Sequence, residues 1–197
     1  MRLIGCVIIS LLCCFHGNAQ EKAIILKNVN VVDVVEGSIR KGQDVVIKKG
    51  IIQAVGKGAG TGVSGEVKDL TGMYVMPGLI DAHVHIANDP KESQADRAKH
   101  LEYFLRHGVT SIRDAAGDAR VLRELKEGVQ QGKYLGPDIY YAAFMAGPAY
   151  FEGNDREKSM VEGWPEPYAP WMQCIRPDSD LDKAMEDAKE WGCTGVK

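Results

Sequence analysis

The chain lacks both an excess of positive charge and a hydrophobic run long enough to cross a membrane. Of its 197 residues, 24 are Lys or Arg and 27 are Asp or Glu, which gives a net charge of −3 at neutral pH. A nucleic-acid or anionic-membrane partner would call for a basic face, so we expect neither. The apolar stretch Leu3–Phe15 has 13 residues, whereas a membrane span needs roughly 20. We therefore expect no stable membrane anchor.

Cysteine is also scarce in most of the chain. Three of the five cysteines lie within the first 14 residues, which leaves Cys174 and Cys193. Two cysteines are too few for a disulfide scaffold. They flank an expected helix over 179–191 that would be about 20 Å long, whereas a disulfide needs Cα atoms within about 7 Å of each other. We predict two free thiols.

Residues 1–19 are predicted to be a secretory signal peptide. A positively charged start is followed by the apolar run and then by small residues that end at Ala19. This is the order of an export signal that is cleaved after Ala19. The segment that ends at Cys6 loosely resembles a lipid-attachment site, but it lies too close to the start to leave an apolar region before it. We expect an exported protein, periplasmic or extracellular, without a lipid anchor.

Residues 20–76 carry a β-strand pattern. Short segments rich in Val and Ile are separated by turns that contain Gly or Asn. The expected strands are 23–32, 44–48, 51–55 and 66–70. Gly60, Gly62 and Gly65 have the spacing of a dinucleotide-binding motif, but they lead into a strand rather than a helix. We therefore predict that these glycines form a plain loop.

From Pro77 onward the pattern changes to strands that alternate with helices, so 77–197 forms a second region. The expected strands are 79–86, 109–113, 138–143 and 194–197, and the expected helices are 93–107, 119–131 and 179–191. Each helix returns the chain to the same end of the sheet, so the strands should be parallel. An eight-fold barrel needs about 250 residues, and not quite four strand–helix units fit here. We interpret this α/β region as the front half of a longer fold.

The stretch before the last helix is rich in proline and aromatic residues, namely Tyr150, Trp164, Tyr168 and Trp171. These aromatic side chains either line a substrate pocket or simply pack, and the sequence leaves both open. Ser179 together with Asp182 resembles a capping box at the start of the last helix. That helix is expected to bury Leu181, Met185, Ala188 and Trp191.

The strand over 79–86 carries the motif Asp81-Ala82-His83-Val84-His85. Because side chains alternate along a strand, Asp81, His83 and His85 share one face, while the opposite face, from Ile80 to Ile86, is apolar and expected to lie under helices. The two imidazoles are about 6.6 Å apart along the strand. They lie at its C-terminal end, where the active sites of parallel barrels gather.

Two imidazoles on one face can approach a single cation at about 2.1 Å from each nitrogen. The pattern therefore favours a divalent metal site at His83 and His85. Asp81 would orient a ligand histidine, contact the metal or pair with a buried partner. Arg113 and Asp114 are expected to form a structural ion pair at a strand end. His100 and His107 belong to a helix, with His107 at its negative end, and are not expected to be ligands.

Residues Pro77 to His85, preceded by a β-rich segment, resemble the amidohydrolase superfamily of metal-dependent hydrolases. Residues 108–114 also resemble the second barrel strand of that superfamily, and 192–197 are similar to the fourth strand of members with a carboxylated lysine. The resemblance covers roughly residues 23–197. It implies the first four strands of a (β/α)8 TIM-type barrel at 77–197, preceded at 20–76 by the N-terminal part of a small β-sandwich.

The resemblance further implies a centre of one or two divalent metals, usually zinc. His83 and His85 would bind the more buried metal, and Lys197 would bridge the two. Since a lysine ammonium is repelled by dications, the bridging residue would be the anionic carbamate formed with carbon dioxide. From its local sequence alone, Lys197 is a solvated lysine at a frayed end. We expect no catalytic base within this chain, because the superfamily takes that aspartate from the eighth strand.

Together these features predict a metal-dependent amidohydrolase that cleaves a carbon–nitrogen bond with a metal-activated water, of which this chain is an incomplete N-terminal part. The expected substrate is a small amide or a dipeptide-like molecule, with its binding residues unknown. The alternatives are a deaminase or single-metal hydrolase of the same fold, which would lack the bridging lysine, and a non-catalytic fragment or binding module. The sequence does not decide whether the protein forms a homo-oligomer.

Overall fold

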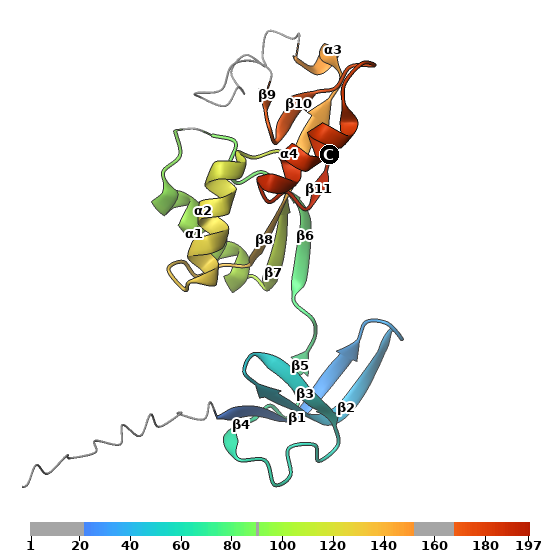
Figure 1. The fold of residues 1–197 in the computed structure, drawn as a ribbon. Coiled ribbons are helices and arrows are strands. Elements are labelled where there is room, and N and C mark those ends of the chain that lie inside the picture. The colour runs from blue at the N-terminus through green and yellow to red at the C-terminus, as the bar shows by residue number, and fades with distance from the viewer. Residues whose placement is uncertain (1–21, 90, 152–167) are drawn as a thin grey trace, which may run out of the picture. The chain divides into compact units, whose positions relative to one another are not determined.

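The computed structural model describes residues 22–89, 91–151 and 168–197. The signal peptide predicted over 1–19 and the aromatic residue Trp164 lie outside the described residues. The chain divides into two compact units after Pro77, and each is described by itself (Figure 1). Within the described part of the chain, no helix is both long and apolar enough to cross a membrane.

The first unit is a five-stranded sheet built around its first strand. The strands are β1 (Ala23–Asp33), β2 (Ser38–Lys48), β3 (Ile51–Gly56), β4 (Gly65–Asp69) and β5 (Tyr74–Val75). Their order is β3-β2-β1-β4, and β5 also pairs with β1. Neighbours are antiparallel in β1–β2–β3, whereas β4 and β5 run parallel to β1. A small apolar cluster of Ala23, Ile25 and Val46 lies within this unit.

The four strands expected in this region are all present, and β5 is an addition. Gly60 and Gly62 lie in turns and Gly65 opens β4, so the prediction of a plain loop is confirmed. A side chain at position 65 would collide with the carbonyl oxygen of Ala23, so glycine is needed where β4 meets β1. The described residues form one sheet here, and the β-sandwich stays a prediction.

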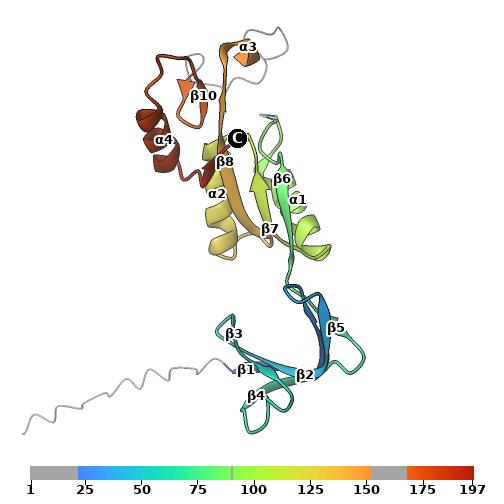
Figure 2. The same ribbon diagram turned by 90° about the vertical axis from the view of Figure 1, so that its right-hand side faces the viewer.

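The second unit carries four parallel strands, β6 (Leu79–Val84), β7 (Val109–Asp114), β8 (Asp138–Ala146) and β11 (Gly195–Val196). β7 pairs with β6 and with β8, and β11 pairs with Ala142 and Ala143 of β8. Every one of these pairings is parallel, as the strand–helix alternation predicts (Figure 2). The fold is therefore α/β, with the strands in chain order.

Two helices, α1 (Gln94–Arg106) and α2 (Ala119–Gln130), cover one face of this sheet (Figure 1). Their buried leucines pack against strand residues in one core, which includes Leu101, Leu122, Leu125, Ile112 and Ile139. Ser93 caps α1 by accepting a hydrogen bond from the backbone of Asp96. Gly108 follows the helix with a φ of 84°, a conformation that only glycine adopts at no steric cost.

The expectation for the opposite face of β6 is correct at one end only. Val84 and Ile86 are buried under the helices, but Ile80 is 72% exposed. β6 lies at the edge of the described sheet. Among the described residues, α1 and α2 reach the C-terminal half of the strand, and nothing covers Ile80.

The last helix, α4 (Leu181–Glu190), differs from its prediction in two ways. Its N-terminal cap is Asp180, which accepts a hydrogen bond from the backbone of Lys183, so the cap expected at Ser179 is wrong. Leu181 and Met185 are 57% and 48% exposed, whereas Ala188 is buried as predicted and Ala184 is buried with it. The buried side of α4 thus carries small residues, and its larger apolar side chains lie on the exposed side.

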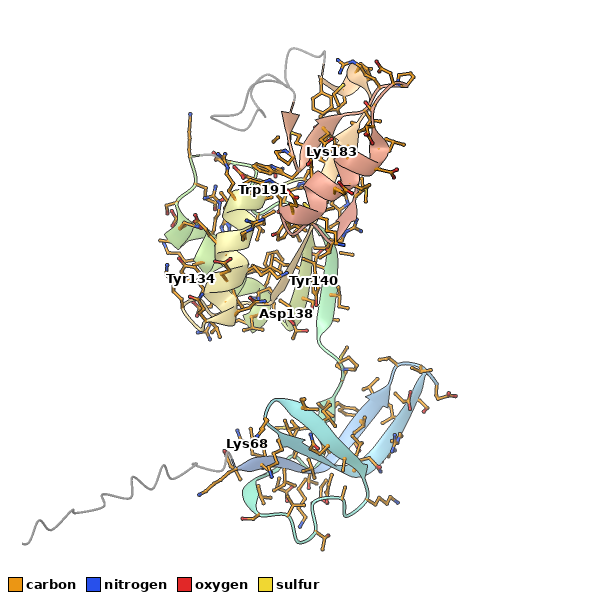
Figure 3. All side chains as sticks on the ribbon, viewed as in Figure 1. Lys68, Tyr134, Asp138, Tyr140, Lys183 and Trp191 are labelled. Atoms are coloured by element: carbon orange, nitrogen blue, oxygen red, sulfur yellow. The ribbon has the colours of Figure 1, made fainter. Side chains whose placement is uncertain are left out.

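Between β8 and α4 the chain adds structure that the sequence does not predict. It consists of α3 (Pro148–Phe151), β9 (Tyr168–Ala169) and β10 (Met172–Cys174). β10 extends the sheet in parallel with the end of β8, and β9 pairs antiparallel with β10. Trp171 is only 1% exposed, and its ring centroid lies 4.7 Å from that of Trp191. Figure 3 labels Trp191 at the end of α4. For Trp171 the packing alternative is therefore the correct one.

Candidate metal centre

The motif on β6 sits at an irregularity in the sheet. Asp81 is paired with Ile112 and Val84 with Asp114, so three residue steps on β6 face two on β7. Such a bulge takes backbone groups out of the ladder and re-aims side chains. The backbone N–H of His83, within this bulge, donates to Asp81 Oδ1 at 3.1 Å. Asp81 therefore stabilises the bulge and acts on the backbone of His83 rather than on its ring.

The bulge brings the two imidazoles together at the end of the strand. His83 Nε2 and His85 Nε2 lie 3.3 Å apart, and the ring planes are inclined by 60°. Both residues are exposed. The two rings that the sequence places on one face of the strand thus lie within 3.3 Å of each other.

Lys197 joins the same group of atoms. Its backbone continues the pairing of β11 with β8, since Lys197 N donates to Ala143 O at 2.8 Å and Lys197 O accepts from Met145 N at 3.1 Å. Its Nζ lies 3.1 Å from His83 Nε2. Strands at opposite ends of the order β6-β7-β8-β11 can share a site only where the sheet curves, as it does in a barrel.

The geometry of the two rings fits a metal ion. Two nitrogens that each lie about 2.0–2.1 Å from one tetrahedral zinc ion are about 3.3 Å apart, which is the distance between the Nε2 atoms of His83 and His85. Imidazole is also a preferred ligand of zinc. Among the described residues, no group of three or more His, Cys, Asp or Glu side chains could hold a metal. The described chain thus supplies two imidazoles and one amine to this site.

A residue that the sequence reasoning missed completes the surroundings of His85. The amide Nδ2 of Asn88 lies 3.1 Å from His85 Nδ1. Asn88 comes three residues after His85, in the loop after β6 (residues 85–93, of which all but residue 90 are described). A polar residue just after a barrel strand is the signal that would have identified it, since such loops build active sites.

Asp114 connects the loop after β6 to the loop after β7. Its carboxylate is fully buried and accepts hydrogen bonds from the backbone N–H groups of Ile86, Ala116 and Gly117. The bonds to Ile86 and Gly117 are both 2.6 Å long. Because the bond to Ile86 adjoins His85, Asp114 fixes the backbone at the end of the motif.

The ion pair expected between Arg113 and Asp114 is wrong. Successive side chains of a strand point to opposite faces, so Asp114 faces the helices while Arg113 points into the sheet's other side. There Arg113 Nη2 donates to the carbonyl of Val196 at 3.3 Å. Arg113 therefore ties β7 to β11, which carries Lys197.

A second buried charge, the guanidinium of Arg97 on α1, also holds the loop after β6. Arg97 is 4% exposed, and its guanidinium donates to the backbone carbonyls of Ile86, Asp89 and Glu92. Its Nε also lies 3.7 Å from the carboxylate of Glu92. The planar guanidinium suits such a role because it offers five donors in a fixed geometry.

The remaining candidate residues lie outside the site or stay untested. His100 pairs with Glu92 at 3.1 Å, and His107 caps α1, so neither points to the centre. Cys174 and Cys193 are free thiols, as predicted. Burial raises the pKa of Cys193 from 9.0 to about 11, which keeps this thiol protonated at neutral pH, whereas a thiolate is the form that binds metals.

An aromatic group lies next to Lys197. The ring centroid of Phe144 is 6.0 Å from Lys197 Nζ and 4.4 Å from the ring centroid of Tyr150. Of the aromatic residues expected after the third strand, Tyr150 is thus packed on Phe144. Tyr150 is therefore linked to the amine of Lys197 through the ring of Phe144, which is itself buried.

The arrangement of this unit matches known proteins. Residues 74–194 match the Amidohydrolase family. The chain belongs to the amidohydrolase family. The match begins just before β6 and ends next to β11, so it includes the two histidines.

Two curated relatives are named for different activities. The chain is 35% identical over 89 residues to a dihydroorotase of Trichlorobacter lovleyi, a match that covers 45% of this chain and 21% of the relative. It is 30% identical over 152 residues to an adenine deaminase of Thermosipho melanesiensis, covering 72% of this chain and 25% of the relative. The chain thus spans about a quarter or less of these two relatives.

Among solved structures, a putative prolidase from Bifidobacterium longum resembles the chain with a TM-score of 0.63 and 25% identity. That likeness covers 89% of this chain and 40% of the other. The structural neighbours are amidohydrolase proteins with the TIM-barrel fold. The α/β architecture predicted from the sequence is thereby confirmed at the level of the fold.

Proposed function

We propose that this chain supplies the first-strand and fourth-strand ligands of a metal-dependent hydrolase that cleaves carbon–nitrogen bonds. The observation that carries the proposal is the convergence of His83 Nε2, His85 Nε2 and Lys197 Nζ, with 3.3 Å between the two ring nitrogens and 3.1 Å from His83 to the amine. Membership of the amidohydrolase family supports it. The expected substrate is a small amide or a dipeptide-like molecule.

In this proposal each residue of the chain has a separate task. His83 and His85 hold a divalent metal, with zinc as the expected ion, through Nε2. Such a metal supplies Lewis acidity and makes water acidic enough to lose a proton near neutral pH. Asp81 keeps the bulge that aims His83, and Asp114 fixes the backbone next to His85.

Lys197 would act as a bridging ligand after carboxylation. The free amine at Nζ forms a bond to the carbon of carbon dioxide and loses one proton to solvent, which leaves an anionic carbamate with two oxygens. This exchange removes a positive charge from a place where dications would repel it. The neighbouring ring of Phe144, 6.0 Å from Nζ, shields one side of the group from water.

Hydrolytic deamination is the second candidate, because one of the relatives is named as an adenine deaminase. It also breaks a carbon–nitrogen bond, but it releases ammonia. For this reaction the site would hold a single metal ion and would have no bridging lysine. Assays with N-acyl amino acids and dipeptides on one side, and with aminopurines on the other, separate the two by their products.

The metal assignment is tested by metal analysis of the full-length protein. After incubation with zinc and dialysis, the parent should retain at least one zinc ion per chain, and His83→Ala should retain much less. His100→Ala is a matched control, because His100 is an exposed histidine of α1 that pairs with Glu92, and it should keep the parent's zinc. Equal zinc in the parent and in His83→Ala would contradict the proposal.

The role of Lys197 has its own test. With ¹³C-labelled carbon dioxide, the full-length parent should show a carbamate carbon by NMR, and Lys197→Ala should lose that signal together with one metal ion per chain. An unchanged metal content and no carbamate in the parent would favour the single-metal form.

Export, which we also propose, predicts a mature N-terminus at Gln20, as read by N-terminal sequencing.

A further inference from the structure

The hydrogen bond between Asn88 and His85 has a direction that does not suit metal binding. An amide nitrogen only donates, so the contact of Asn88 Nδ2 with His85 Nδ1 at 3.1 Å makes Nδ1 the acceptor. The proton of a neutral His85 ring then sits on Nε2. In this tautomer the lone pair of Nε2, the atom that faces His83, is not free for a metal.

A metal-binding Nε2 requires the opposite tautomer. The proton must move to Nδ1, and Nδ1–H then needs an acceptor, which in metal sites is commonly a carboxylate or a carbonyl oxygen. Asn88 can supply it without any movement of the backbone. A half-turn of its amide group exchanges Nδ2 for Oδ1 at the same place.

We propose that Asn88 is the positioning residue that sets the tautomer of His85, with Nδ2 donating in the metal-free protein and Oδ1 accepting in the metal-loaded protein. This inference rests on the proposed function, because it takes His85 as a ligand through Nε2. A neutral amide serves both tautomers, so Nδ1 has a partner before and after loading. A carboxylate would serve only the loaded form, and an apolar side chain would serve neither.

The surrounding contacts explain how Asn88 keeps its place. The loop that carries it is held at Ile86 and Asp89 by the buried Arg97, and again at Ile86 by Asp114. The carbonyl of Ala87, directly before Asn88, accepts a hydrogen bond from Asp118 N at 3.1 Å. With the backbone fixed on both sides of position 88, the rotation of the side-chain amide is the freedom that remains.

The test compares two variants of the full-length protein, Asn88→Ala and Asn88→Asp, by zinc affinity and by ¹⁵N NMR of the His85 ring at pH 8. Loss of an outer hydrogen-bond partner typically weakens metal affinity 10- to 100-fold, and this is the loss expected for Asn88→Ala. Asn88→Asp should bind zinc at least as tightly as the parent. Without zinc, the His85 ring should carry its proton on Nε2 in the parent and on Nδ1 in Asn88→Asp.

A matched control is Asn30→Ala, which removes a side-chain bond of Asn30 to the backbone of Gly42 in the first unit and should leave zinc affinity unchanged. Thermal unfolding without zinc shows whether each variant is folded. If Asn88→Ala binds zinc like the parent, the inference is overturned while the metal site stands. Equal weakening in both variants would also overturn it, because a mere packing role predicts that result. A parent that binds no zinc overturns the proposed function itself.

Discussion

The two sides of the candidate centre are held by different means. On the histidine side, the loop after β6 is fixed by the buried charges of Arg97 and Asp114, which together make six hydrogen bonds to backbone groups. On the lysine side, β11 has two residues and is held to β8 by backbone pairing. An exposed hydrogen bond of Arg113 and a partly buried one of Tyr141 add to this pairing.

From this difference we infer that the histidine side and the lysine side have different tasks in the centre. Ligands that bind a metal tightly gain from a rigid backbone, because the ring positions are then set before the metal arrives. The histidine side has that form. The lysine side depends on a long flexible side chain, whose Nζ adjusts its position more easily than a ring does. The comparison predicts that substitutions on the histidine side cost more stability than substitutions on the lysine side.

The largest effect is expected at Asp114. Asp114→Ala leaves three backbone N–H groups without their acceptor, and each buried unsatisfied donor costs about 1–3 kcal/mol. We expect a loss of about 4 kcal/mol in the free energy of unfolding, measured by urea denaturation. Asp89→Ala removes an exposed carboxylate that bonds only to Lys91 N among described contacts, and it should cost much less. Equal losses of stability in Asp114→Ala and Asp89→Ala would contradict the special role given to Asp114 on the histidine side.

The second-largest loss in the free energy of unfolding is expected for Arg97→Ala. Arg97→Ala removes the donors to three backbone carbonyls and the 3.7 Å ion pair with Glu92, whose carboxylate keeps its contact with His100. Breaking a buried charged pair costs about 3–5 kcal/mol, and we expect about 3 kcal/mol here because Glu92 is partly exposed. Hydrogen exchange should also become faster in residues 85–89. A variant with unchanged exchange in that loop would show that Arg97 does not hold it.

On the lysine side, a smaller effect is expected at Tyr141. Its hydroxyl donates to the carbonyl of Trp191 at 2.9 Å, just before β11. Tyr141→Phe removes this bond and the contact of the hydroxyl with Arg123, so the free energy of unfolding should fall by about 1 kcal/mol. Urea denaturation measures the change. A loss as large as that of Asp114→Ala would contradict the proposed difference between the two sides.

At neutral pH the smallest effect is that of the Cys193 thiol, whose ionisation changes stability only at alkaline pH. Burial raises the pKa of this thiol from 9.0 to about 11, so the folded protein keeps a proton that the unfolded chain releases. Stability is therefore unaffected below pH 9 and falls as the pH rises from 9 to 11. Cys193→Ala should flatten that slope in urea denaturation across this range. A slope that is the same in the variant would show that Cys193 does not contribute to it.

Much of the fold follows from short-range patterns in the sequence. Val-rich and Ile-rich segments predict the strands of the first unit, and the alternation of strands and helices from Pro77 onward predicts α1 and α2. Alternation along a strand places His83 and His85 on one side. These features depend on neighbours within a few residues, and for that reason one sequence suffices to predict them.

The features that the sequence does not predict depend on distant partners. The exposure of Leu181 and Met185 depends on which side of α4 faces the rest of the unit, and that side carries Ala184 and Ala188. The strands β9 and β10 exist because the end of β8 offers them a paired edge. The role of Asn88 depends on the ring of His85, which local periodicity does not describe. The expected pair of Arg113 and Asp114 failed for a local reason, since alternation along β7 already separates them.

The most direct test of the central claim is anomalous diffraction at the zinc edge from crystals of the full-length protein loaded with zinc. The account predicts an anomalous peak within about 2.1 Å of both His83 Nε2 and His85 Nε2, with Lys197 reaching the same centre. A peak elsewhere in the molecule, with the two rings turned away from each other, would contradict it.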